Sequence, residues 1–386
     1  MNISTGRLKL VAATAVGICW LLVGHAAYRG HANDKDYNAL LAFDPSLRGT
    51  AVDSCVTCHR TGNVPDPEKP GTMRRENHCE YCHATYVAGK GDIKQTLNRF
   101  GADYLAAGRG VEAIRKIADA DSDGDGVSNR AELLKGGNPG DPDTNPLLPV
   151  APSRVVSLAE MAKLAPVSSQ TMLMNTSHSP SGDSYDSFRG FRLYELLQAI
   201  GISPSADSID FISLDGFERT HTLDELKGSW PQGAPVLGLG KAELGSCGWV
   251  SYNAKGLDPT RPLPAASILL AFEENGSKIA PATIDPKTGR IVGTGPLRLV
   301  VPQFHISPPD LSPTADKSCL DKVAPEYHAN DKYDRNGGRS NFSIVAVRVN
   351  PLPKGTRDPE WQKVADQYIA GDQVVFYGAL KGTGGR

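Results

Sequence analysis

The chain carries the pattern Cys-x-x-Cys-His twice within 29 residues, first at positions 55–59 and again at 79–83. Two cysteines at this spacing can form thioether bonds to the two vinyl groups of one porphyrin, and the adjacent histidine can then bind the iron. The sequence therefore predicts two covalently attached c-type haems. The attachment residues would be Cys55, Cys58, Cys79 and Cys82, and the proximal iron ligands would be His59 and His83.

The same four cysteines also fit a zinc ribbon, because two C-x-x-C pairs are separated by 20 residues. Zinc bound by four thiolates would leave His59 and His83 without a role. A histidine at the same place in both copies argues against coincidence, so we favour haem over zinc.

Each iron needs a sixth ligand or keeps an open position. His78 directly precedes Cys79 and is close in sequence to both patterns, so we expect it to bind the first iron. His31 is the candidate for the second iron, and Met73 is an alternative whose thioether would raise the reduction potential. Two histidine ligands on each iron predict a low-potential electron carrier, whereas an open position would permit small-molecule chemistry.

An acidic stretch at residues 121–132 fits the twelve-residue calcium loop of an EF-hand position by position. Gly126 occupies the position that requires a sharp turn. The predicted ligands, including the main-chain carbonyl at the seventh position, are Asp121, Asp123, Asp125, Val127, Asn129 and Glu132. Ser128 replaces the usual aliphatic residue at the eighth position and the loop occurs once, so it resembles the single loops of dockerin and thrombospondin type-3 repeats. We expect a structural calcium site; the alternative is an acidic loop in solvent.

The N-terminus has the layout of a secretory signal. Arg7 and Lys9 precede an apolar run of 14 residues from Leu10 to Val23, so residues 1–27 are predicted to be a signal peptide. A membrane span needs about 20 apolar residues, which favours cleavage over retention as an anchor. We expect the protein to be exported, to the periplasm or the extracellular space. Cys247 and Cys319 could pair in an oxidising compartment, although 72 positions separate them.

Composition limits the classes of function. A chain of 386 residues with 40% hydrophobic residues is long enough for two or three domains with their own cores. The net charge of −2, from 41 basic and 43 acidic residues, gives no sign of nucleic-acid binding. We expect redox proteins, such as other cytochromes, as partners, and membrane contact only through an uncleaved N-terminal anchor.

The elements around the two haem patterns must position the iron ligands. Residues 33–150 form the predicted dihaem module, which is mostly helical and rich in loops because Gly and Pro punctuate both patterns. Apolar residues recur at helical spacing from Ile93 to Leu105 and from Val111 to Ala118. Turn residues at 137–146 then predict a domain boundary near residue 150.

Residues 151–386 are predicted to form a β-rich α+β domain, which makes the chain a multidomain protein. Phe191–Ile200 has the periodicity of a helix that ends at Gly201. Asp215-Gly216 and Asn275-Gly276 are typical of hairpin turns. The expected strands are Ile209–Leu214, Arg219–Leu223, Ser267–Phe272, Lys278–Ile279, Leu297–Val301, Ser343–Val349 and Gln373–Phe376.

The order of these elements resembles the molybdopterin-binding domain of the sulfite oxidase family. Residues 190–197, 212–217 and 295–302 carry the resemblance, which covers about half of the chain. It implies molybdenum held by a pyranopterin dithiolene and by one cysteine that follows a strand and precedes the helix. The corresponding stretch here, residues 172–178, contains no cysteine, and Asn or Ser cannot replace a soft thiolate without changing the chemistry. We therefore expect this fold without molybdopterin.

Two functions remain open. The first is an exported dihaem c-type cytochrome that acts in electron transfer. The alternative is a sulfite-oxidase-like molybdenum oxidoreductase that passes electrons to its own c-type haems. The missing cysteine favours the electron carrier, and the sequence identifies no catalytic residue.

Overall fold

The computed structural model describes residues 35–48, 50, 52, 57–59, 62–65, 73–76, 94, 97–176, 182–214, 216–252, 256–285, 291–311, 316–330 and 332–381. The predicted signal peptide lies outside these residues. Within the described ranges, no helix is long and apolar enough to cross a lipid bilayer.

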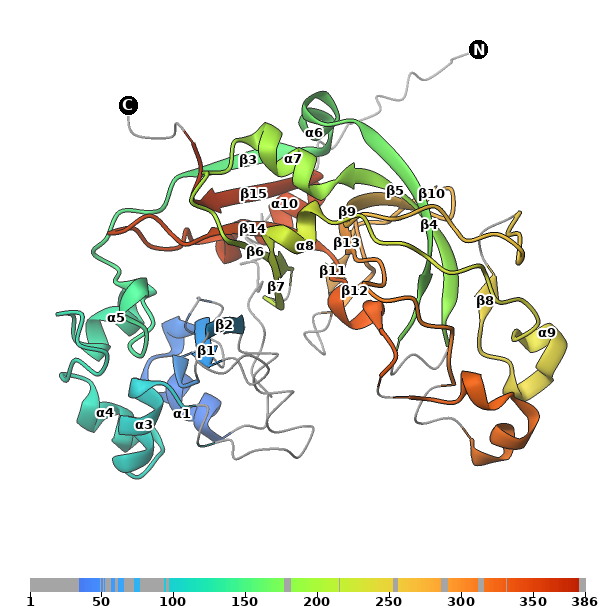
Figure 1. The fold of residues 1–386 in the computed structure, drawn as a ribbon. Helices are drawn as coiled ribbons and strands as arrows, with labels where there is room; N and C mark the ends of the chain where they lie inside the picture. Colours follow the sequence, from blue (N-terminus) through green and yellow to red (C-terminus); the bar gives the residue numbers. More distant parts are fainter. Residues whose placement is uncertain are drawn as a thin grey trace, which may run out of the picture.

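The residues before 150 form mainly short helices, which gather at one end of the molecule (Figure 1). They are α1 (Lys35–Phe43), α3 (Arg99–Ala106), α4 (Val111–Ile117) and α5 (Asn129–Lys135), with 3-10 turns η1 (Pro45–Leu47) and η5 (Pro142–Thr144). An antiparallel hairpin of β1 (Gly62–Pro65) and β2 (Met73–Glu76) accompanies them. The four helices share one small core, to which they contribute Leu40, Phe100, Ile114 and Leu133.

The predicted helices of this part are only partly right. α4 agrees with the expected span, and α5 ends at Gly136 in the left-handed conformation. The helix expected from Ile93 was placed too early, because α3 begins at Arg99. Leu97 instead pairs with His59 in a β-bridge, and the Asn98 side chain caps α3 by accepting the Gly101 amide proton at 2.8 Å.

The residues after 150 build two larger sheets. One runs in the order β10-β9-β5-β4, with β13 on β9 and β8 on β5; the other runs β3-β15-β14-β6-β7. The first sheet comprises β4 (Val167–Met174), β5 (Ser184–Arg192), β8 (Ser251–Tyr252), β9 (Leu269–Glu274), β10 (Ser277–Lys278) and β13 (Arg298–Val300). The second comprises β3 (Ser153–Ser157), β6 (Ser208–Ser213), β7 (Glu218–Thr222), β14 (Ile344–Asn350) and β15 (Gln373–Gly378). β11 (Thr283–Ile284) and β12 (Ile291–Val292) form a separate hairpin.

Short helices complete this part: α6 (Leu158–Leu164), α7 (Leu193–Ile200), α8 (Leu223–Lys227), α9 (Lys241–Leu244) and α10 (Ala365–Ala370). The largest core joins both sheets to α7, with Phe211 from β6, Leu270 from β9 and Leu197 from α7. All the expected strands are present within one or two residues at each end. Phe191 was assigned to the wrong element, because it lies in β5, which ends at Arg192, and the helix begins at Leu193.

The two parts of the chain have separate cores. The core of the helical part draws its buried members from residues 39–133, whereas the other four clusters draw theirs from residues 151–379. Arg357 connects the two parts, because its amide donates to the Pro149 carbonyl and its Nε donates to the Leu148 carbonyl. The boundary expected near residue 150 falls in the same stretch and stays a prediction.

A disulfide joins Cys247 to Cys319, whose Cα atoms lie 5.3 Å apart. Cys247 ends the 3-10 turn η6 (Gly245–Cys247), and Cys319 lies in η7 (Lys317–Lys322). The pairing left open by the sequence is therefore present in the structure.

Candidate haem and cation sites

The described part of the first haem pattern consists of Thr57, Cys58 and His59. Cys58 is half-buried and packs against the core of the helical part. The buried Thr57 hydroxyl donates to the Val52 carbonyl at 2.6 Å. The end of this pattern is thus held against the core of the helical part.

Asn98, which is 8% exposed, holds the same three residues from the start of α3. Its main-chain nitrogen donates to the Cys58 carbonyl at 3.0 Å. Its Nδ2 donates to the Thr57 carbonyl at 3.1 Å and reaches the His59 carbonyl at 3.5 Å. Gly101, one turn further along α3, lies so close that a Cβ there would be 2.0 Å from the Cys58 carbonyl oxygen.

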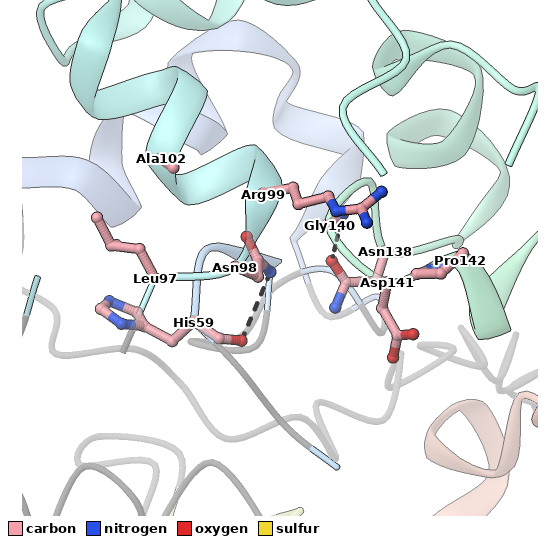
Figure 2. Close-up of a pocket in the computed structure, with 9 residues that line it drawn as sticks. All are labelled: His59, Leu97, Asn98, Arg99, Ala102, Asn138, Gly140, Asp141 and Pro142. Carbon is pink, nitrogen blue, oxygen red and sulfur yellow. Dashed lines mark hydrogen bonds between the residues drawn. The ribbon is translucent and has the colours of Figure 1, made fainter. Parts of the chain in front are cut away.

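A pocket of about 390 Å³ opens beside His59 (Figure 2). One wall is the bridge and the start of α3, and the other is the segment that follows α5. The lining residues are His59, Leu97, Asn98, Arg99, Ala102, Asn138, Gly140, Asp141 and Pro142. Because the predicted iron ligand lines this pocket and Cys58 precedes it, these residues fit one wall of a haem site.

The remaining haem residues lie outside the described part of the chain. They are Cys55, Cys79, Cys82 and His83, together with the distal candidates His78 and His31. Met73 begins β2. The structure therefore describes only Cys58 and His59 of the predicted attachment residues and proximal ligands, and both haem sites stay predictions from the sequence.

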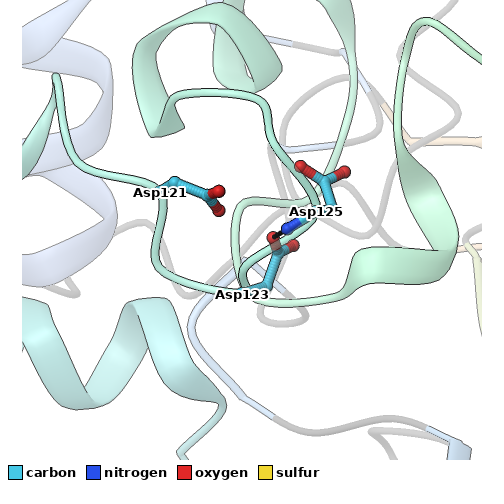
Figure 3. A group of neighbouring side chains, drawn as sticks. All are labelled: Asp121, Asp123 and Asp125. Carbon is cyan, nitrogen blue, oxygen red and sulfur yellow. Dashed lines mark hydrogen bonds between the residues drawn. The ribbon is translucent and has the colours of Figure 1, made fainter.

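The carboxylates of Asp121, Asp123 and Asp125 come together in the acidic loop, with oxygen atoms within 4.8 Å of one another (Figure 3). The amides of Gly124 and Gly126 donate to the Asp121 carboxylate at 2.7 and 2.9 Å. Both glycines have φ values near +90°, a conformation that most other residues avoid. The loop backbone is thus folded around its acidic side chains.

Several buried carboxylate oxygens of this loop have no hydrogen-bond partner among the described residues. They are one oxygen each of Asp123 and Asp125 and both oxygens of Glu132, which is fully buried. Burial, and then the charges of the neighbouring aspartates, raise the pKa of Glu132 to about 8. Burial likewise raises the pKa of Asp123 to about 6. Since unpartnered buried carboxylates are costly and a divalent cation would partner them, the residues present fit calcium.

Val127 and Asn129, the other two predicted ligands, do not contribute carboxylates and are placed differently from the acidic residues. The buried Val127 lies at the expected turn, where its amide donates to Asp125 Oδ1 at 2.8 Å. The Asn129 side chain bonds to the loop and to the end of α4, because its Oδ1 accepts from the Ser122 amide and its Nδ2 donates to the Ile117 carbonyl. Ser128, the departure from the EF-hand pattern, caps α5 by accepting from the Ala131 amide. A direct Asn129 contact with calcium stays a prediction.

Asn175 follows β4, in the stretch where the resemblance to the sulfite oxidase family would place a molybdenum ligand. It is fully buried; its main-chain amide donates to Asn336 Oδ1 at 2.9 Å, and its Nδ2 donates to the Pro308 carbonyl at 3.1 Å. The only cysteines of the sequence after residue 82 are Cys247 and Cys319, and the disulfide joins them. Neither offers a thiolate, so these residues do not fit molybdenum ligation of the family's kind.

No protein-family model matches the chain, and no curated protein matches its sequence.

Proposed function

We propose that this chain is an exported dihaem c-type cytochrome that carries electrons between redox partner proteins. The duplicated Cys-x-x-Cys-His pattern carries the proposal. The first copy gives it structural support, because His59 lines a pocket and Asn98 fixes the backbone around Cys58. Each haem would supply one-electron chemistry, and the protein would hold the iron ligand and shield one side of the site.

Export is supported by the Cys247–Cys319 disulfide, because disulfides persist mainly in oxidising compartments. The predicted signal at residues 1–27 agrees with this location. Calcium at residues 121–132 would serve as a structural ion, since even weak affinity suffices at extracellular calcium concentrations.

Haem content tests the proposal. The exported protein should give a pyridine haemochrome spectrum with two c-type haems per chain. The double variant Cys55→Ser/Cys58→Ser should lose one haem, and Cys79→Ser/Cys82→Ser should lose the other. Cys247→Ser/Cys319→Ser is the matched control and should keep both. Protein with bound zinc and no haem would contradict the proposal.

Metal analysis separates the electron carrier from the alternative, a molybdenum oxidoreductase. The disulfide and the buried Asn175 leave the second part of the chain without a thiolate ligand, so we expect no molybdenum after purification. One molybdenum per chain would overturn this expectation and favour the enzyme.

The distal ligand has its own test. If His78 binds the first iron, His78→Ala should convert one of the two haems to high spin while haem content stays at two. An unchanged low-spin spectrum would assign the sixth ligand elsewhere, to His31 or Met73 among the candidates.

Calcium binding can be measured directly by titration calorimetry. Glu132→Gln should weaken binding by more than the ~10–100-fold that loss of an outer-shell partner costs, because it removes a buried ligand. Asp119→Asn is the control, since the Asp119 side chain is 86% exposed and pairs with Arg130. Equal affinities of Glu132→Gln and the parent protein would contradict the predicted ligand set.

A further inference from the structure

Two neighbouring residues at the start of α3 reach to different sites. Asn98 donates to the carbonyls of Thr57 and His59 in the first haem pattern. Arg99 extends to the acidic loop, where its Nη1 donates to the main-chain carbonyl of Asp123. Both residues also line the pocket beside His59. The start of α3 therefore connects the predicted haem and cation sites through hydrogen bonds donated by two adjacent residues.

A second link runs through the segment after α5. Glu132 lies in α5, and its carbonyl accepts from the Gly137 amide at 2.9 Å. Gly140 then packs so tightly on Asn98 that a Cβ at Gly140 would be 2.2 Å from the Asn98 Cγ. Asn138, Gly140 and their neighbours form the wall of the pocket opposite Leu97 (Figure 2). The acidic loop and the pocket wall are thus parts of one short stretch of chain.

We infer that calcium binding at the acidic loop sets the reduction potential of the first haem, with Asn98 and Arg99 as positioning residues for the haem segment, a coupling that presupposes the dihaem function proposed above. The cation would fix Asp123 and Glu132, and these two residues hold the two links to the pocket. Solvent exposure, hydrogen bonding and nearby charge are the factors by which a protein tunes a haem potential.

The sign of the effect follows from charge. An added divalent cation disfavours the more positive, oxidised haem and therefore raises its potential. Removing calcium takes away this charge and loosens the pocket wall, which admits water that also stabilises the oxidised form. Both effects lower the potential. By linkage, calcium binds the reduced protein more tightly, and each tenfold ratio of the two dissociation constants corresponds to about 59 mV for a one-electron couple.

The test is a redox titration of the full-length, haem-loaded protein in excess calcium and in excess chelator. Calcium removal should lower one of the two midpoint potentials and leave the other in place. Two unchanged potentials would overturn the inference, and so would equal shifts of both, which indicate a general charge effect. Haem content and calcium stoichiometry are measured on the same sample, so that absence of either group, which would contradict the proposed function, is recognised separately.

Variants locate the coupling. Arg99→Ala should still bind calcium but lose at least half of the calcium-dependent shift, whereas Arg99→Lys keeps a donor for the Asp123 carbonyl and should retain most of it. Asn98→Ala should lower the same potential even with calcium bound. Arg115→Ala is the matched control, because Arg115 is exposed on α4 and pairs with Glu112. A full shift in Arg99→Ala would overturn the role of Arg99.

Discussion

Asp183, which directly precedes β5, shows how burial changes the chemistry of a single carboxyl group. Its side chain is 1% exposed, and its two oxygens accept the Thr176 and Asp310 amide protons at 2.9 and 3.0 Å. Burial outweighs these hydrogen bonds and raises its pKa from 3.8 to about 7. Because the folded value is the higher one, the stabilising contribution is complete below pH 3.8 and is lost as pH rises through about 7.

Asp183→Asn should therefore flatten the fall in the free energy of unfolding between these pH values. The variant should also be less stable by about 1–3 kcal/mol at the acidic end, because an amide nitrogen cannot accept the second main-chain proton. Urea unfolding across this range checks both effects, with calcium in excess so that Asp123 and Glu132 stay bound. Asp224→Asn is the control: the Asp224 side chain is 94% exposed, so this variant should show the same pH dependence of stability as the parent protein. If the free energy of unfolding of Asp183→Asn fell with pH as steeply as that of the parent protein, the prediction would be wrong.

At the scale of elements, the features that depend on a local sequence pattern could be predicted. The buried run of β14 and the apolar face of α7 follow from periodicity, and the acidic loop follows from spacing alone. The start of α3 could not be predicted in this way, because Leu97 fits the apolar pattern although it lies in a β-bridge. The helix begins only after its N-cap, Asn98. The role of Asn98 at the haem pattern was also missed, because contacts between residues about 40 positions apart leave no mark on local periodicity.

The disulfide between η6 and η7 makes a prediction about this pair of elements. It closes a loop of 72 residues, for which the loss of unfolded-state entropy corresponds to roughly 4 kcal/mol. Cys247→Ser/Cys319→Ser should lower the free energy of unfolding by up to that amount. Chemical denaturation with and without a thiol reductant provides the measurement. Reductant should destabilise the parent protein and leave the double variant unchanged; equal sensitivity of the two proteins would contradict a stabilising disulfide.

The whole molecule combines a small helical part with a larger two-sheet part, and each has its own core. The acidic loop belongs to the first part and the disulfide to the second. The connection that Arg357 makes with residues 148–151 consists of a few hydrogen bonds and is small compared with either core. Calcium binding and reduction of the disulfide should therefore stabilise or destabilise different parts of the chain.

Calorimetry of the full chain should accordingly show two unfolding transitions. Calcium at 100 times its dissociation constant stabilises the state that binds it by ~2.7 kcal/mol. For a folded unit of about 100 residues this raises the midpoint by roughly 10–20 °C, so one transition should move by that amount and the other should stay in place. Reduction of the Cys247–Cys319 disulfide should move the second transition and not the first. One transition that responds to both treatments would mean that the parts unfold together and that the boundary near residue 150 is not a thermodynamic one.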